Sequence, residues 1–209
     1  MLITLEKQFA KLFSVFFHPL LIPIWVYLGL IWQVDLIMLR IPYNVVWKLA
    51  GLIFLTTFML PLSIIMLMLR FKMISSLQMP MRQERIAPLM VTAIFFFLTY
   101  YILKTLQIAP VLYVYMLGAT LLAVIASAIT LWWKISLHMI GVGALTGAFA
   151  GLALLSPNTF TMLLILAILV SGLTGTSRLI LSAHKPIEVY IGFLTGLALV
   201  LNLFLWIGN

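Results

Sequence analysis

The chain has 209 residues, of which 65% are hydrophobic and only 8% are charged, and its formal net charge is +8. A soluble domain carries about 25% charged residues, so this composition excludes a soluble fold, a disordered chain and a coiled coil. Since a spanning helix needs about 20 apolar residues, the length predicts an integral membrane protein with six or seven spans.

Seven apolar runs follow one another and predict an all-α helical bundle that forms a single transmembrane domain over residues 1–209. The first run, 12–32, contains His18, Pro19 and Pro23, so we expect it to be kinked or partly interfacial. A polar stretch with Asp35 and Arg40 follows. The remaining runs cover residues 46–69, 86–106, 110–133, 137–155, 160–181 and 187–206.

Glycines recur at four-residue spacing in two of the later runs. Gly143, Gly147 and Gly151 lie in the fifth run, and Gly192 and Gly196 lie in the seventh. Small residues at this spacing let helices approach closely in lipid. We therefore interpret these glycines as packing positions.

The basic residues predict an orientation in the membrane. With seven spans, nine of the twelve Lys and Arg lie on the same side as the N-terminus, and the positive-inside rule makes that side cytoplasmic. Four of the nine cations, Arg82, Arg85, Lys134 and Arg178, can instead bind phosphate. Without them, five basic residues on the N-terminal side stand against three on the other side, which favours the same orientation. We expect an inner (plasma) membrane protein of a bacterium, a cytoplasmic N-terminal leader that is not a cleaved signal peptide, and no nucleic-acid partner.

Few side chains can perform chemistry, because the chain has three histidines, four acidic residues and no cysteine. His138 begins the fifth run, and His184 lies between the sixth and seventh. Glu188 follows His184 by four residues, which is one helical turn. A carboxylate at that spacing can accept an imidazole N–H and fix its tautomer, which leaves the other ring nitrogen free to attack or to carry a proton. Arg178 lies near His184 along the chain and can bind a tetrahedral anion.

Each of these residues also has a structural interpretation. Interfacial histidines often anchor a helix in the head-group region, an arginine near a helix end snorkels, and an isolated Glu near a Lys forms a weak surface pair. A metal site with two His and one Glu is less attractive, since His138 and His184 show no local ligand spacing. We expect no metal and no cofactor.

Three stretches of the sequence resemble the signatures of the type-2 phosphatidic acid phosphatase family. Ser177-Arg178, five residues, His184, three residues and Glu188 is similar to the third signature, in which the last residue is Asp. Ser136-Leu137-His138 resembles the second signature, with Ser and His in place. The first signature is less complete: Lys72 is followed by Met79 and Pro80 at the matching offset, and Arg82 and Arg85 lie just beyond. The resemblance covers about residues 70–200.

The resemblance implies a fold of six or seven helices and a phosphohistidine mechanism without a metal. It implies that His184 is the nucleophile, that Glu188 orients it, and that His138 is the general acid. It also implies a set of phosphate-binding residues, which are Arg178, Ser136, Ser177, Arg82 and Arg85. The expected activity is hydrolysis of a lipid phosphate or diphosphate, with a phosphorylated lipid in the bilayer as the partner.

Two departures keep a second interpretation open. Leu137 stands where the family has glycine, and the first signature lacks its Arg-Pro pair. The chain is therefore either a divergent enzyme or a non-catalytic binder or carrier of phosphorylated lipid with the same fold. A small transporter or channel is least favoured, because the run centres hold almost no charged residues. For His18, we favour a role at the proline kink over a place in the site.

Overall fold

The computed structural model describes residues 2–33, 41–79 and 81–208, so Asp35, Arg40 and Pro80 lie outside the described residues. The described part is helical and contains no strand. Six helical stretches are long and apolar enough to cross a membrane, and a seventh is formed if a broken pair near the N-terminus counts as one span. The prediction of an all-α membrane protein with six or seven spans is thus confirmed.

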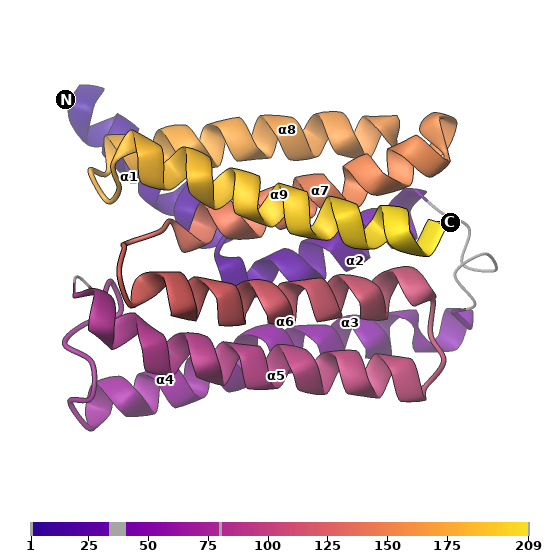
Figure 1. The fold of residues 1–209 in the computed structure, drawn as a ribbon, viewed down its shortest axis with the longest axis horizontal. Helices are drawn as coiled ribbons and strands as arrows, with labels where there is room; N and C mark the ends of the chain where they lie inside the picture. Colours follow the sequence, from indigo (N-terminus) through magenta and orange to yellow (C-terminus); the bar gives the residue numbers. More distant parts are fainter. Residues whose placement is uncertain (1, 34–40, 80, 209) are drawn as a thin grey trace. The chain divides into compact units, whose positions relative to one another are not determined.

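The chain forms two compact units (Figure 1). Unit 1 comprises residues 1–22 and 135–209, and unit 2 comprises residues 23–134. Unit 1 holds α1, the 3-10 turn η1, α7, α8 and α9. Their bounds are Leu2–Phe16, Pro19–Leu21, Leu137–Leu155, Pro157–Ile180 and Pro186–Gly208.

Helix α7 is the centre of unit 1, and α9 packs along it over most of its length (Figure 1). The glycines make this contact close. A Cβ atom at Gly147 would lie 2.6 Å from the carbonyl oxygen of Leu197, and one at Gly192 would lie 2.8 Å from that of Ser136. A Cβ at Gly196 would collide with the carbonyl of Ile140. The predicted packing role of the glycines is therefore confirmed.

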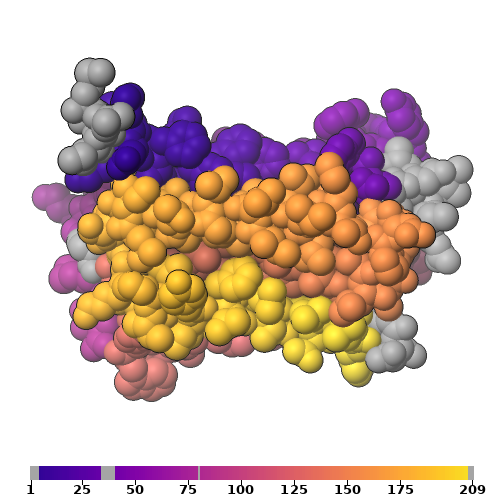
Figure 2. All heavy atoms as spheres, turned by 90° about the horizontal axis from the view of Figure 1, so that it is seen from above, coloured from indigo at the N-terminus to yellow at the C-terminus, as the bar shows by residue number. Residues whose placement is uncertain are grey.

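Helix α8 contacts α7 and α9, and α1 lies against α8 (Figure 2). Helix α1 begins ten residues earlier than the first apolar run predicts. Among its described side chains it buries a narrow stripe, Ala10 and Ser14, which are four residues apart and lie on one face. Most of its other described apolar side chains are exposed, which is why the sequence predicts a leader before the first span. The predicted break near His18 is present, since α1 ends at Phe16 and η1 begins at Pro19.

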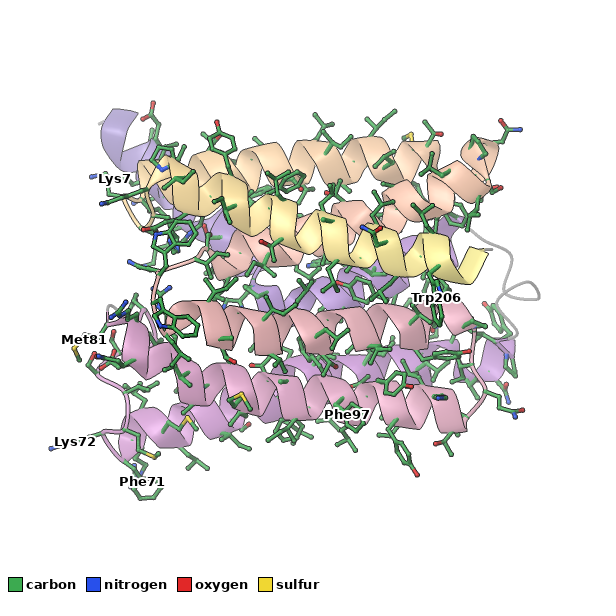
Figure 3. All side chains as sticks on the ribbon, in the orientation of Figure 1. Lys7, Phe71, Lys72, Met81, Phe97 and Trp206 are labelled. Atoms are coloured by element: carbon green, nitrogen blue, oxygen red, sulfur yellow. The ribbon has the colours of Figure 1, made fainter. Side chains whose placement is uncertain are left out.

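Unit 2 holds the helices from α2 to α6 and three short turns. The helices are α2 Ile22–Gln33, which enters from unit 1, α3 Val46–Phe54, α4 Leu60–Arg70, α5 Ile86–Thr105 and α6 Pro110–Thr130. The turns are η2 Tyr43–Val45, η3 Leu55–Met59 and η4 Arg82–Arg85. Helices α5 and α6 form the main antiparallel pair. Lys72 and Met81 mark the connection between α4 and η4 at one end of this unit, and Phe97 lies on α5 (Figure 3).

The stretch α3–η3–α4 is one helical span with a π turn at its centre. Pro61 lies at the start of α4 and has no N–H, so the regular bond to the carbonyl four residues earlier cannot form there. The ladder widens instead, and the N–H of Leu60 donates to the carbonyl of Leu55, five residues back. Thr99 on α5 donates to the Thr56 hydroxyl at 2.8 Å and ties this turn to the neighbouring helix.

Candidate functional site

The α8–α9 connection places His184 beside Glu188. Helix α8 ends with two bonds, from Ser182 N–H to the Leu179 carbonyl and from Ala183 N–H to the Arg178 carbonyl. These are the bonds of a Schellman motif, and Ser182 occupies the left-handed position with φ 50°. Pro186 then starts α9, as prolines often start helices. The chain therefore reverses tightly, at the end of unit 1 opposite Trp206 (Figures 1 and 3).

His184 and Glu188 form a close pair. His184 Nδ1 lies 2.7 Å from Glu188 Oε2, and both side chains are less than a tenth exposed. A carboxylate only accepts hydrogen bonds, so Nδ1 carries the proton. The backbone N–H of Lys185 also donates to Oε2, at 3.3 Å. Glu188 lies in the first turn of α9, where the helix dipole favours a negative charge. The pair therefore fixes the tautomer of His184 in which Nε2 carries the lone pair.

Helix α7 places His138 and Ser136 next to this pair. The N–H of Ser136 donates to the Glu188 carbonyl at 3.4 Å, so the start of α7 is joined to the start of α9. His138 is the second residue of α7, and its Nε2 lies 3.0 Å from the Ser14 carbonyl of α1. Because a carbonyl only accepts, Nε2 is the protonated nitrogen and Nδ1 is the one left for proton transfer.

The hydroxyl group of Ser136 has no protein partner. Ser136 is 0% exposed and precedes α7 at the position where a serine side chain usually caps the helix, yet its hydroxyl makes no hydrogen bond within the described residues. The first N–H groups of a helix have no partner inside the helix. The start of α7 therefore combines a buried free hydroxyl with a helix N-terminus, which is an arrangement that suits an anion.

Arg178 brings a positive charge to the same place. It lies in the last turn of α8, is half-buried, and interacts electrostatically with both His18 and His138. His184 and His138 also interact electrostatically. Unit 1 therefore contains all three histidines together with Glu188 and Arg178.

The other predicted phosphate-binding residues make hydrogen bonds of their own, and two of them belong to unit 2. The Ser177 hydroxyl donates to the Leu173 carbonyl on its own helix at 2.8 Å. Arg82 and Arg85 belong to unit 2, where they donate to the carbonyls of Trp132 and Met79. Among the described residues, no three His, Asp or Glu side chains are grouped in a way that would hold a metal ion.

The N-terminal segment makes contacts with His138 that the sequence does not predict. His18 lies at the break before η1, as expected, but its ring is also 5.4 Å from that of His138, centroid to centroid and edge to face. Ser14, which holds His138 through its carbonyl, was not predicted. No local spacing connects residues 14 and 18 with residue 138, so only the packing of α1 and η1 within unit 1 reveals these contacts.

Comparisons with protein-family models, with curated proteins and with solved structures find no match to this chain. The resemblance to the phosphatase family therefore stays a prediction from the sequence motifs.

Proposed function

We propose that this protein is a membrane-embedded phosphatase that hydrolyses a lipid phosphate or diphosphate through a phosphohistidine intermediate, with the fold of the type-2 phosphatidic acid phosphatases. The observation that carries the proposal is the buried 2.7 Å pair of His184 and Glu188 in the unit that also holds His138 and Arg178. An oriented imidazole, a second imidazole and a guanidinium are the groups that phosphoryl transfer requires.

His184 acts as the nucleophile. Glu188 holds the Nδ1 proton, so Nε2 is the nitrogen whose lone pair attacks phosphorus. As the P–N bond forms, the imidazole becomes positively charged, and the carboxylate stabilises that charge. Glu188 thereby contributes more to the transition state than to the resting state, which is the condition for catalysis.

His138 serves as the general acid and then as the general base. The cycle starts with the anionic substrate bound and His138 protonated at both nitrogens, because the phosphate charge stabilises the imidazolium, and Nε2–H is donated to the Ser14 carbonyl. When the P–O bond to the lipid breaks, Nδ1 gives its proton to the departing oxygen. His138 then takes a proton from water while the water oxygen attacks phosphorus. The P–N bond breaks, inorganic phosphate leaves, and both histidines return to their starting states.

The phosphoryl oxygens are bound at the start of α7 and by Arg178. Ser136 contributes a buried hydroxyl whose proton is not engaged by the protein, and the first N–H groups of α7 contribute further donors. Arg178 contributes charge. Only groups of unit 1 enter this proposed site.

A lipid is favoured as the substrate because nearly the whole chain consists of long apolar helices. The His184–Glu188 pair lies in the connection between two of these helices, so a head group reaches it while the acyl or prenyl tail stays in the bilayer.

The test measures phosphate release by the purified protein from vesicles that contain phosphatidate, phosphatidylglycerol phosphate or a polyprenyl diphosphate, without added metal. We expect release from at least one of them and its loss in His184→Ala. The matched control is Thr195→Val, a half-buried position on α9 whose hydroxyl donates to its own helix. No release across the panel, or release that persists in His184→Ala, would refute the proposal.

A second function, binding of a phosphorylated lipid without turnover, is favoured by one observation. Leu137 is the first residue of α7 and directly follows Ser136, whose hydroxyl is buried. In this case the protein binds inorganic phosphate but releases none from lipid, and Leu137→Gly restores release. Turnover by the unaltered protein excludes this function.

A further inference from the structure

His18 lies where α1 ends and η1 begins, and its ring has a defined tautomer. The backbone N–H of Leu20 donates to His18 Nδ1 at 3.3 Å. Because that nitrogen accepts, the proton of the neutral ring is on Nε2. The other hydrogen-bonding position of the ring is therefore a donor.

This donor is not used within the described protein. The bond from Leu20 occupies Nδ1, and Nε2 has no hydrogen-bond partner among the described residues. His18 is half-buried, so this nitrogen is accessible to a group from outside the protein. Nε2–H is therefore a donor that can bind a ligand at this position.

The surroundings indicate an anion. The ring of His18 lies edge to face with that of His138, at a centroid distance of 5.4 Å, and it interacts electrostatically with Arg178. A second unpartnered donor is close in the chain, since the buried Ser14 hydroxyl has no protein partner while the Ser14 carbonyl holds His138. A cation, a neutral N–H and a buried hydroxyl together match the several oxygens of a phosphate group.

We propose that His18 is a further phosphate-binding residue, which donates its Nε2–H to an oxygen of a phosphomonoester or diphosphate group held beside His138 and Arg178. The N-terminal segment of unit 1 thus completes the anion site with a donor that lies outside all three motif stretches. This inference rests on the proposed function for its catalytic consequence but not for binding itself.

His18 has two structural roles, which are to accept the Leu20 N–H and to pack its ring against His138. Three substitutions separate these roles from phosphate binding. His18→Asn keeps a side-chain acceptor close to the Leu20 N–H, and asparagine is a good cap, but it has no donor at the Nε2 position. His18→Gln places an amide donor near the Nε2 position but caps less well. His18→Phe keeps a ring beside His138 and removes both nitrogens.

The first measurement is binding of inorganic phosphate to the purified protein, followed by the ¹⁵N resonances of the labelled histidines. We expect the Nε2 resonance of His18 to shift on titration. We also expect the Kd for phosphate to rise about tenfold or more in His18→Asn and His18→Phe, because hydrogen bonds to charged groups contribute more than neutral ones. In His18→Gln the Kd should rise much less. Similar Kd values in Gln, Asn and Phe would overturn the proposal, as would preserved binding in Phe.

The second measurement is the KM and kcat for phosphate release from phosphatidate vesicles, which tests a lipid head group rather than the free ion. We expect His18→Asn and His18→Phe to raise KM and His18→Gln to restore it in part. Turnover with no response to these substitutions overturns the role of His18 and leaves the phosphatase intact. Phosphate binding that depends on His18, without any turnover, supports this inference and refutes the phosphatase. A protein that neither binds nor hydrolyses phosphate refutes both.

Discussion

The two units differ in how many of their buried hydroxyl groups lack a hydrogen-bond partner within the described residues. In unit 2, Thr92, Thr120 and Thr130 donate to carbonyls of their own helices and Thr99 links two helices, while the hydroxyl of Thr57 has no such partner. In unit 1, Thr146, Ser171 and Ser177 are bonded, but the buried hydroxyls of Ser14, Ser136 and Thr174 make no hydrogen bond within the described residues.

The difference indicates where a ligand belongs. A buried hydroxyl that donates to its own helix is stable without a ligand, whereas an unpartnered one costs about 1–3 kcal/mol. Ser136 directly precedes the helix that carries His138, the Ser14 carbonyl contacts His138, and Thr174 lies one turn before Arg178. Unit 1 therefore tolerates the cost of these groups close to its charged and imidazole side chains, which is typical of binding and catalytic sites.

The largest effect is expected at Glu188, the carboxylate that pairs with His184 in unit 1. Glu188→Gln keeps the shape of the side chain but removes the charge that stabilises the imidazolium of His184, so kcat for phosphate release is expected to fall about a hundredfold or more. Glu188→Asp keeps the charge and should lose less. Steady-state kinetics on phosphatidate vesicles measure both. Equal activity of Gln and the unaltered protein would remove the orienting role of Glu188.

The next effect concerns the close contact of α7 with α9. A Cβ at Gly196 would collide with the Ile140 carbonyl, so Gly196→Ala is expected to destabilise the protein by about 1–3 kcal/mol and to disturb the site that this contact aligns. Gly172 in unit 1 and Gly51 in unit 2 are the controls, because a Cβ at either meets no atom within 4 Å. Thermal unfolding in detergent, followed by tryptophan fluorescence, should show a lower Tm for Gly196→Ala alone. A similar loss at Gly172 would mean that helix association is not the cause.

The sequence predicts contacts between residues that are close along the chain better than contacts between distant residues. Helix α7 runs from Leu137 to Leu155, as predicted, because a loop precedes it and Ser156-Pro157 end it. The contact of His184 with Glu188 is also found, since a spacing of four residues is local. The contacts of His138 with Ser14 and His18 span more than a hundred residues and depend on how α1 and η1 pack, for which the sequence has no periodic signal.

A smaller effect is expected at the two serines that precede helices in unit 1. The hydroxyl of Ser136 has no partner, whereas that of Ser156 bonds to Thr159 at 3.2 Å. Ser136→Ala should therefore lower kcat/KM about tenfold, equivalent to the loss of one hydrogen bond to a charged group, with little change in Tm. Ser156→Ala should lower Tm and leave kcat/KM unchanged. The reverse pattern would place the ligand away from the start of α7.

The smallest effect compares two threonines that are equally buried. Thr57 in unit 2 and Thr174 in unit 1 are both 0% exposed, and neither hydroxyl has a hydrogen-bond partner within the described residues. Valine has nearly the same shape and removes the unsatisfied group, so both Thr57→Val and Thr174→Val should stabilise the protein by about 1 kcal/mol. Only Thr174→Val should also weaken phosphate binding, because only Thr174 lies one turn from Arg178. Unfolding temperatures and phosphate titrations of the two variants measure this. If Thr57→Val weakened binding as much as Thr174→Val does, an unpartnered hydroxyl would no longer distinguish the unit that binds the anion.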